Sequence, residues 1–272
     1  MRTILITGAA GTLGQRLSAA FQNSGDKVVG IDRESRGAAG LVEADLSRWS
    51  EAWASAFLGC DVVVHLAADP LPSAPWSSLQ PFNIDLTLNV FEAAARAKAR
   101  RLIFASSNWV MAGYRPATGP ITTDAAPFPI NGYGATKLMG ERAGRFFSDT
   151  RGLSVICLRI GMAERPGGTR PGPETPQGLW GQQMWLSDRD MLQGFVKAVE
   201  APADLRFAVV NLMSANEGMR WDIEATRQAI GYVPQDSHPT YSSASIELQE
   251  RLVCSTLESS AQQLALVSSG PF

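Results

Sequence analysis

A tyrosine and a lysine stand four residues apart at Tyr133 and Lys137, and this spacing could support proton transfer. Residues four apart in a helix lie on the same face, so the ammonium group would lie beside the phenol. The pKa of a free tyrosine is about 10, and a neighbouring cation lowers that pKa toward neutral pH. Ser107, at the end of a predicted strand, could hydrogen-bond and polarise the reacting oxygen. These residues predict a tyrosine base that Lys137 tunes, with Ser107 orienting the substrate.

A glycine-rich turn near the start of the chain predicts the second reactant. Gly8, Gly11 and Gly14 follow a short apolar strand pattern and open an amphipathic stretch. In this order the first glycine makes a tight turn, the second lets the backbone approach a pyrophosphate, and the third allows close helix–strand packing. A purely structural turn is the alternative, but the strand–turn–helix context favours a dinucleotide at the helix N-terminus. We expect contacts from Gly8, Ala10, Gly11, Thr12, Leu13 and Gly14.

An acidic residue at the end of the second predicted strand indicates which dinucleotide binds. The carboxylate of Asp32 is placed where it could hold both hydroxyls of a ribose. A 2′-phosphate would lie close to that negative charge, so the sequence favours NAD over NADP. Arg33, the next residue, could pair with such a phosphate and weakens this preference slightly.

The next two strand ends supply further candidate cofactor contacts. Asp45 and Leu46 end the third predicted strand, where they could flank an adenine. Asp45 could equally cap the helix that follows, and the sequence leaves both roles open. Leu66, Ala67 and Ala68 end the fourth strand, where small residues would let the cofactor lie against the backbone.

The composition argues against several other classes of protein. Lys and Arg total 24 against 26 for Asp and Glu, and the net charge of −2 gives no electrostatic reason to expect nucleic acid or an anionic membrane. The two histidines argue against a histidine-rich metal site, and His65, inside an apolar strand, is expected in the core. The cysteines Cys60, Cys157 and Cys254 are far apart and suit a reducing compartment. We therefore expect a cytoplasmic protein without a metal, a signal peptide or a membrane-spanning segment.

The first part of the chain alternates strand and helix patterns, which is typical of parallel βαβ units. Strands are predicted at 3–7, 27–31, 41–44, 61–66, 101–105 and 154–159, and helices at 11–24, 49–58, 83–99 and 133–149. We expect an α/β fold, a doubly wound parallel Rossmann sheet with helices on both faces, in which residues 1–160 bind NAD and carry the catalytic groups.

The alternation changes after residue 160. Residues 163–178 are rich in proline and glycine, which is typical of a loop. Helices are predicted at 187–200, 221–230 and 243–266, with a strand at 206–211. We expect residues 161–272 to form a small substrate-binding lobe, interleaved with the sheet, over its C-terminal edge.

Taken in order along the chain, these motifs resemble the extended branch of the short-chain dehydrogenase/reductase superfamily. The resemblance implies that Ser107, Tyr133 and Lys137 form a catalytic triad, with Tyr133 and Lys137 also contacting the cofactor. Asn83 lies where the family often has a structural or proton-relay asparagine, although Asn89 is also near. We count Asn83 among the cofactor contacts.

Within that superfamily the chain is most similar to bacterial uronate dehydrogenases, which use NAD to oxidise the anomeric carbon of a uronate to a lactone. The similarity rests on Phe104-Ala105-Ser106-Ser107-Asn108, Gly132-Tyr133-Gly134-x-x-Lys137, Arg159-Ile160-Gly161 and Trp185-Leu186-Ser187-Asp188-x-Asp190. It implies oxidation of a sugar hydroxyl, Ile160 near the cofactor, and a sugar or sugar acid as substrate. The expected substrate contacts are Pro70, Ser107, Asn108, Trp109, Tyr133, Met162 and Trp180.

The chain departs from the uronate pattern where the sugar carboxylate would bind. Met162 replaces a serine, Trp109 a histidine, and Trp180 aligns with the arginine that grips the carboxylate. An indole cannot replace a bidentate guanidinium contact, so either Arg165 or Arg170 reaches in or the substrate is a neutral sugar. The tryptophans at 109, 180 and 185 could stack on a pyranose or simply form core.

The sequence also allows two alternative functions and indicates an assembly state. A sugar-nucleotide epimerase, reductase or dehydratase is one alternative, and the short C-terminal part argues against it. A non-catalytic NAD-binding protein is the other, and the intact triad argues against that. The helices starting near Asn83 and Tyr133 resemble those that pair between subunits in this superfamily, so we expect a homodimer or a higher homo-oligomer.

Overall fold

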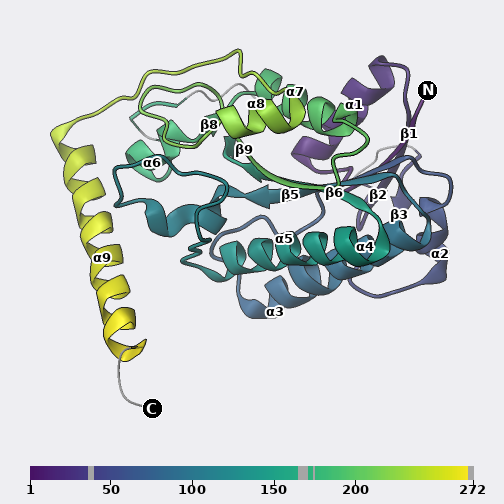
Figure 1. Ribbon diagram of the computed structural model, residues 1–272, viewed down its shortest axis with the longest axis horizontal. Helices are drawn as coiled ribbons and strands as arrows, with labels where there is room; N and C mark the ends of the chain where they lie inside the picture. Colours follow the sequence, from purple (N-terminus) through teal and green to yellow (C-terminus); the bar gives the residue numbers. More distant parts are fainter. Residues whose placement is uncertain (36–39, 165–170, 174, 269–272) are drawn as a thin grey trace.

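Seven parallel strands form one sheet at the centre of the computed structural model, which describes residues 1–35, 40–164, 171–173 and 175–268 (Figure 1). Their spatial order is β3-β2-β1-β4-β5-β6-β9. The strands are β1 (Thr3–Thr7), β2 (Lys27–Asp32), β3 (Val42–Glu43), β4 (Val62–His65), β5 (Arg101–Ser107), β6 (Ser154–Ile160) and β9 (Phe207–Leu212). The direction of connection reverses between β1 and β4, which is where parallel sheets of this kind bind ligands, at the carboxyl ends of the strands. The expected α/β Rossmann sheet is confirmed.

Helices cover both faces of the sheet (Figure 1). One face packs under α1 (Thr12–Asn23), α7 (Asp188–Glu200) and α8 (Glu224–Ile230), where Leu17, Phe21 and Phe195 contribute to a buried apolar cluster. The other face packs under α2 (Glu51–Ala54), α4 (Leu86–Arg96) and α5 (Gly132–Arg151), where Phe91 and Phe147 contribute to a second cluster. The strands are apolar on both sides because both of their faces are covered.

The part of the chain after residue 160 is joined to the sheet. β9 pairs in parallel with β6 from Val155–Phe207 to Ile160–Leu212, so a strand from the predicted lobe forms the edge of the main sheet. The short strands β7 (Met162–Ala163) and β8 (Trp185–Leu186) pair with each other, and α6 (Gly178–Gln183) lies between them in sequence. These two strands are too short for a periodic pattern to reveal them.

Several predicted helices differ in extent from the observed ones. The predicted helix at 49–58 is α2 followed by a 3₁₀ turn at Ser55–Phe57. The predicted helix from 83 begins earlier, because α3 (Trp76–Leu79) and a π-helical stretch at Gln80–Asp85 lead directly into α4. A further 3₁₀ helix at Asn108–Tyr114 follows β5.

The C-terminal helix α9 (Ala244–Ser268) projects from the body of the molecule (Figure 1). Its first half is anchored by Glu250, whose carboxylate accepts hydrogen bonds of 2.8 and 2.7 Å from Arg115. No helix among the described residues is long and apolar enough to cross a membrane. Part of the loop predicted at 163–178, residues 165–170 and 174, lies outside the described ranges.

One buried arginine joins the amino end of β5 to the end of α7. Arg101 is fully buried, and its guanidinium donates hydrogen bonds of 2.6 Å each to the carbonyl oxygens of Ala201 and Pro202. Its Nε donates to Ser154 on β6. Burial lowers the pKa of Arg101 to about 10, so the group stays charged at neutral pH. The charge is therefore stabilised by oriented carbonyl dipoles, and none of its hydrogen-bond acceptors among the described residues is a carboxylate.

We predict that Arg101→Met lowers the free energy of unfolding by roughly 3 kcal/mol, because several buried carbonyls lose their donor. The matched control is Arg100→Met. Arg100 is exposed and makes one long contact of 3.4 Å to Val199, so its loss should cost less than about 0.5 kcal/mol. Urea denaturation of both variants measures the difference, and equal losses would contradict this role.

The histidine expected in the core is there. His65 on β4 is buried, with Nδ1 2.8 Å from Thr7 Oγ1 and Nε2 3.2 Å from Thr87 Oγ1. Burial, with a smaller contribution from the Lys137 charge, lowers the pKa of His65 to about 3. The ring is therefore neutral in the folded protein and serves as a hydrogen-bonded core residue.

This burial makes folding sensitive to acid. Between pH 6.5 and about 3 the unfolded chain binds a proton at His65 that the folded chain does not, so stability falls as pH decreases through this window. We predict that the wild type loses about 2 kcal/mol more than His65→Gln between pH 7 and pH 5. Denaturation curves at both pH values test this, and equal losses in the two proteins would contradict the role of His65.

Candidate active site

The glycine turn after β1 has the geometry that a pyrophosphate needs. Gly8 has a φ of +73°, and a Cβ there would lie 2.8 Å from the backbone nitrogen of Ala67. A Cβ at Gly14 would collide with the carbonyl oxygen of Gly8. Side chains at these two positions would therefore push β1, α1 and the end of β4 apart. The three segments meet closely enough for a ligand to contact backbone only because glycine stands there.

The start of α1 is open to an anion. Its first residue is Thr12, and the N-cap Gly11 offers no side chain to satisfy the free N–H groups of the first turn. Uncapped N–H groups and the helix dipole both favour a phosphate at this place. Leu13 is half-buried and packs against the core beneath the turn.

Asp32 lies beside this turn at the end of β2. Its Oδ2 accepts a hydrogen bond of 2.9 Å from the backbone nitrogen of Ala10, and its Oδ1 accepts one of 2.7 Å from Arg33. Arg33 is exposed, and its guanidinium lies 4.8 Å from the centroid of the Phe82 ring. The turn and the carboxylate are thus held together before any ligand arrives, which fits the donor set of a dinucleotide.

The residues expected near the adenine have mixed outcomes. Asp45 Oδ1 accepts a hydrogen bond of 3.0 Å from the backbone of Ser47, while Ser50 caps α2. The alternative of Asp45 as that helix cap is therefore wrong. The Leu46 side chain is buried in the core, and its carbonyl oxygen accepts a hydrogen bond from Asn89. Any contact between Leu46 and an adenine would therefore involve its backbone.

The end of β4 lies against the glycine turn. The backbone nitrogen of Ala67 donates a 3.3 Å hydrogen bond to Thr7 Oγ1 at the end of β1. Leu66 packs against the core cluster, and Ala68 is half-buried. The structure thus brings residues 66–68 and the turn to the same edge of the sheet.

Ser107 and Tyr133 are brought together by β5 and α5. Ser107 is the last residue of β5 and pairs with Ile160 of β6. Tyr133 is in the first turn of α5, which Asn131 caps by accepting a 2.7 Å hydrogen bond from Gly134. A Cβ at Gly134 would lie 2.5 Å from the carbonyl oxygen of Trp109, so glycine lets this turn approach the end of β5. The Ser107 hydroxyl and the Tyr133 phenol consequently lie close enough for the serine to lower the pKa of the tyrosine.

Lys137 lies one turn further along α5 and is buried. Its Nζ donates a 2.9 Å hydrogen bond to the carbonyl oxygen of Ala105 and lies 5.6 Å from the centroid of the Tyr133 ring. Burial lowers the pKa of Lys137 to about 8. Burial also raises the pKa of Tyr133 to about 12, against the lowering effect of the Ser107 hydrogen bond. Without ligands, the site therefore keeps the tyrosine protonated.

Asn83 and Asp69 form a bridge between the end of β4 and α5. Asn83 Oδ1 accepts a 2.8 Å hydrogen bond from the backbone nitrogen of Asp69. Its Nδ2 donates 3.2 Å hydrogen bonds to the Asp69 carbonyl oxygen and to Thr136 Oγ1. Both amide hydrogens of Asn83 thus donate to other protein atoms. This favours a structural role for Asn83 over the alternative role in a proton relay.

The residues expected at the substrate lie around the end of β5 in different environments. Asn108 is buried and donates a 3.3 Å hydrogen bond to the Ile160 carbonyl oxygen, while its Oδ1 has no partner among the described residues. Trp109 and Met162 are half-buried, and Pro70 is exposed. Asn108 Oδ1 is thus a buried acceptor near Ser107 that has no hydrogen-bond donor among the described residues.

The stacking wall expected from Trp109, Trp180 and Trp185 loses two of its three members. Trp180 is 2% exposed, its ring centroid lies 4.6 Å from that of Trp221, and the Arg220 guanidinium lies over its face. Trp185 is also buried. Trp180 and Trp185 therefore form core, which was the alternative to stacking on a sugar. Trp180 has no ring face open to a sugar. The arginines at 165 and 170 lie outside the described residues.

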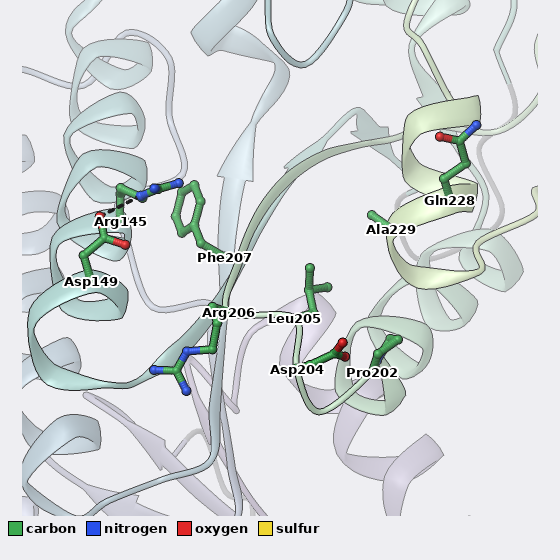
Figure 2. Close-up of a pocket in the computed structure, with 9 residues that line it drawn as sticks. All are labelled: Arg145, Asp149, Pro202, Asp204, Leu205, Arg206, Phe207, Gln228 and Ala229. Carbon is green, nitrogen blue, oxygen red and sulfur yellow. Dashed lines mark hydrogen bonds and ion pairs between the residues drawn. The ribbon is translucent and has the colours of Figure 1, made fainter.

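Two cavities lie along β9, away from Tyr133. The one in Figure 2 has a volume of about 530 Å³ and opens between α5, the loop before β9, and α8. Arg145 and Asp149, joined by a hydrogen bond, face it from α5, while Gln228 and Ala229 face it from α8 (Figure 2). A second cavity, of about 410 Å³, is lined by Arg159 among others. Neither is lined by the glycine turn or by Ser107, Tyr133 or Lys137.

The sequence prediction did not include a group of polar residues around the triad: Asp69, Ser106, Glu141 and Arg159. A signal existed for Glu141, which stands four residues after Lys137 on the same helical face. Ser106 and Arg159 occur in the motifs quoted above, but their contact spans separate elements. Only the fold brings them together.

Comparison with known proteins places the site in a family. A model of the NAD dependent epimerase/dehydratase family matches residues 4–182. The chain is 37% identical over 253 residues to an L-arabinose 1-dehydrogenase (NAD(P)(+)) of Haloferax volcanii, covering 88% of this chain and 99% of that protein. It is 30% identical over 274 residues to a uronate dehydrogenase of Pseudomonas putida, covering 99% and 97%.

Solved structures agree with these sequence relatives. A mutant uronate dehydrogenase from Agrobacterium tumefaciens, in complex with NAD, superposes with a TM-score of 0.72 at 29% identity. That comparison covers 87% of this chain and 86% of the other. The expected membership of the extended short-chain dehydrogenases/reductases is confirmed: the chain belongs to the NAD dependent epimerase/dehydratase family.

Proposed function

We propose that this protein is an NAD-dependent dehydrogenase that oxidises the anomeric hydroxyl of a neutral aldose to a lactone. The observation that carries the proposal is the contact of Ser107 with Tyr133, with Lys137 buried one turn away. A serine, a tyrosine and a lysine in this arrangement can remove a hydroxyl proton, and the relatives are NAD-dependent sugar dehydrogenases.

The proposed chemistry assigns one role to each member of the triad. Ser107 donates a hydrogen bond to the anomeric oxygen and orients it. Tyr133 takes the proton of that hydroxyl as the carbon loses its hydride. Lys137 holds the nicotinamide ribose and, through its charge, favours the phenolate form of Tyr133. NAD⁺, when bound, supplies the hydride acceptor and a further positive charge, which would offset the effect of burial on the tyrosine pKa.

The cofactor would lie across the crevice at the carboxyl ends of β1 and β4. The glycine turn and Asp32 would hold the adenosine and pyrophosphate half, because their donors and carboxylate are already arranged there. We propose that residues 66–68, Ile160 and the triad bound the nicotinamide half, with Asp45 and Leu46 near the adenine.

The substrate side favours a neutral sugar. Trp180 replaces the arginine of the uronate pattern and is buried against Trp221, so this position offers no cation to a carboxylate. Asn108 Oδ1 can accept a hydrogen bond from a sugar hydroxyl, and Trp109 and Met162 would contact the ring. An L-arabinose 1-dehydrogenase, which is named for a neutral sugar, is 37% identical to the chain. An epimerase that keeps its cofactor through the cycle is the less supported alternative.

Two further proposals concern where the protein is found and how it assembles. We propose a cytoplasmic protein, because Cys60, Cys157 and Cys254 are all free. We also propose a homodimer through the outer faces of α4 and α5, where Leu88, Met139 and Phe146 expose apolar side chains.

The function is tested by mixing the purified protein with NAD⁺ and a panel of pentoses, hexoses and uronates, and following NADH by absorbance. We expect the highest kcat/KM with a neutral aldose and a lactone as the product. Tyr133→Phe should lower kcat by about 10³-fold or more while NAD⁺ still binds, because the base is lost and the ring remains. Preference for a uronate would contradict the neutral substrate, and absence of NADH with every sugar would contradict the function.

Asp32 should set the choice of cofactor. We predict that kcat/KM for NAD⁺ exceeds that for NADP⁺ by at least about tenfold, because the carboxylate repels a 2′-phosphate. Asp32→Ser should reduce this ratio to about one, and adding Arg33→Ala should weaken NADP⁺ again. Initial rates at fixed sugar concentration measure the ratio. An unchanged ratio in Asp32→Ser would show that the carboxylate does not select the cofactor.

A further inference from the structure

A buried ion pair ties together three elements of the active site. Glu141 Oε1 on α5 accepts hydrogen bonds from Ser106 Oγ on β5 at 2.6 Å and from Arg159 Nε on β6 at 2.9 Å. Glu141 Oε2 accepts a third, also 2.9 Å, from Arg159 Nη2. The side chains of Arg159 and Glu141 are 2% and 4% exposed. We call these three residues the Ser106–Glu141–Arg159 cluster.

Each residue of this cluster lies close in sequence to a proposed functional residue. Ser106 directly precedes Ser107, and Arg159 directly precedes Ile160, whose carbonyl oxygen accepts the Asn108 hydrogen bond. Ser106 and Arg159 are partners in the β5–β6 register. Glu141 stands one helical turn after Lys137. The cluster therefore joins the two strand ends to the helix that carries the base.

The packing around the cluster explains why directional contacts are needed. α5 approaches the sheet through Gly140 and Gly144, where a Cβ would collide with the Phe104 ring or lie 2.9 Å from Val155. Van der Waals contacts of this kind bring the helix close, but they resist a shift along the strands less than directional contacts do. Hydrogen bonds from Ser106 and Arg159 to one carboxylate fix the position along that direction, because they lengthen when the helix shifts.

The cluster stabilises the fold less than apolar residues in the same space would. A buried ion pair loses solvation that apolar residues of similar volume would not lose. Arg159 Nη1 is in addition buried without a partner among the described residues. The neighbour of Arg159 on the same face of β6, Cys157, belongs to the apolar cluster. Stability alone therefore gives no reason for charges at this place.

We propose that Glu141 is a positioning residue that holds α5 at the position along β5 and β6 where Tyr133 meets Ser107 and Lys137 meets Ala105. The proposal rests on the proposed roles of the triad. Glu141 contacts neither substrate nor cofactor in this role and acts through the placement of the helix. A shift of α5 by about 1 Å would cost on the order of 100-fold in the rate of the chemical step.

The test replaces the whole cluster with apolar residues of similar size, as the triple variant S106A/E141L/R159M, so that no charge is left buried alone. We expect its melting temperature to stay within a few degrees of the wild type. We expect kcat to fall about 10- to 100-fold with KM for the sugar little changed, and the dissociation constant for NAD⁺ to rise about threefold or more. The matched control is R145Q/D149N, which removes the exposed ion pair on the same helix and should change none of these values.

The readouts separate this proposal from the proposed function. NAD⁺ affinity, measured by calorimetry, reports on Lys137 even if no sugar proves to be a substrate. If the triple variant does not fold, R159K serves instead, since it keeps the charge and loses the two-point contact, and it should lower kcat or NAD⁺ affinity at an unchanged melting temperature. A folded variant with kcat and NAD⁺ affinity both within twofold of wild type would overturn the positioning role.

Discussion

The close contact of α5 with β5 and β6 is the constraint on which the rest of the site depends. Tyr133 and Lys137 are both on this helix, while Ser107 and the carbonyl of Ala105 that holds Lys137 are on β5. The helix can reach the sheet only because glycines stand at 140 and 144, opposite Phe104 and Val155. The same approach buries Lys137 and Tyr133, so the packing that brings the groups together also sets their protonation. The packing of α5 on the sheet therefore determines both the positions of Tyr133 and Lys137 and the shifts of their pKa values.

The electrostatics explains why a cofactor belongs in this site. Burial disfavours both the phenolate of Tyr133 and the ammonium of Lys137 and shifts their pKa values in opposite directions. A positive ligand beside the tyrosine would favour the phenolate, whereas another hydrophobic wall would not. The N-terminus of α1, which has no side-chain cap, and the carboxylate of Asp32 lie at the same edge of the sheet. The electrostatics of the site therefore fits a bound dinucleotide that brings a positive charge close to Tyr133.

Much of the fold was predictable because parallel strands buried on both faces form short apolar runs that the sequence displays directly. The strands at 3–7, 27–32 and 154–160 were found nearly to the residue. The elements that were mislocated lack such a pattern: the π-helical stretch before α4, the two-residue strands β7 and β8, and the short α2 with its 3₁₀ turn. The places of Asp32, Ser107, Tyr133 and Lys137 on these elements were predictable because each lies at a fixed offset from a strand end or a helix start. Trp180 was not, since an indole suits a sugar face and a core equally well until its neighbours are known.

The sequence by itself determined the glycine turn, the order of the elements and the one-turn spacing of Tyr133 and Lys137, because these are local properties of the chain. The tertiary structure decided which distant residues meet. It placed β9 at the edge of the main sheet, buried Trp180 against Trp221, and joined Ser106, Glu141 and Arg159 from three separate elements. Such contacts depend on the register between strands and on the sliding position of a helix over them, and neither is encoded in the pattern of any single segment. Ser107, Tyr133 and Lys137 can therefore be recognised in the sequence, while their positions relative to one another depend on contacts that only the folded chain makes.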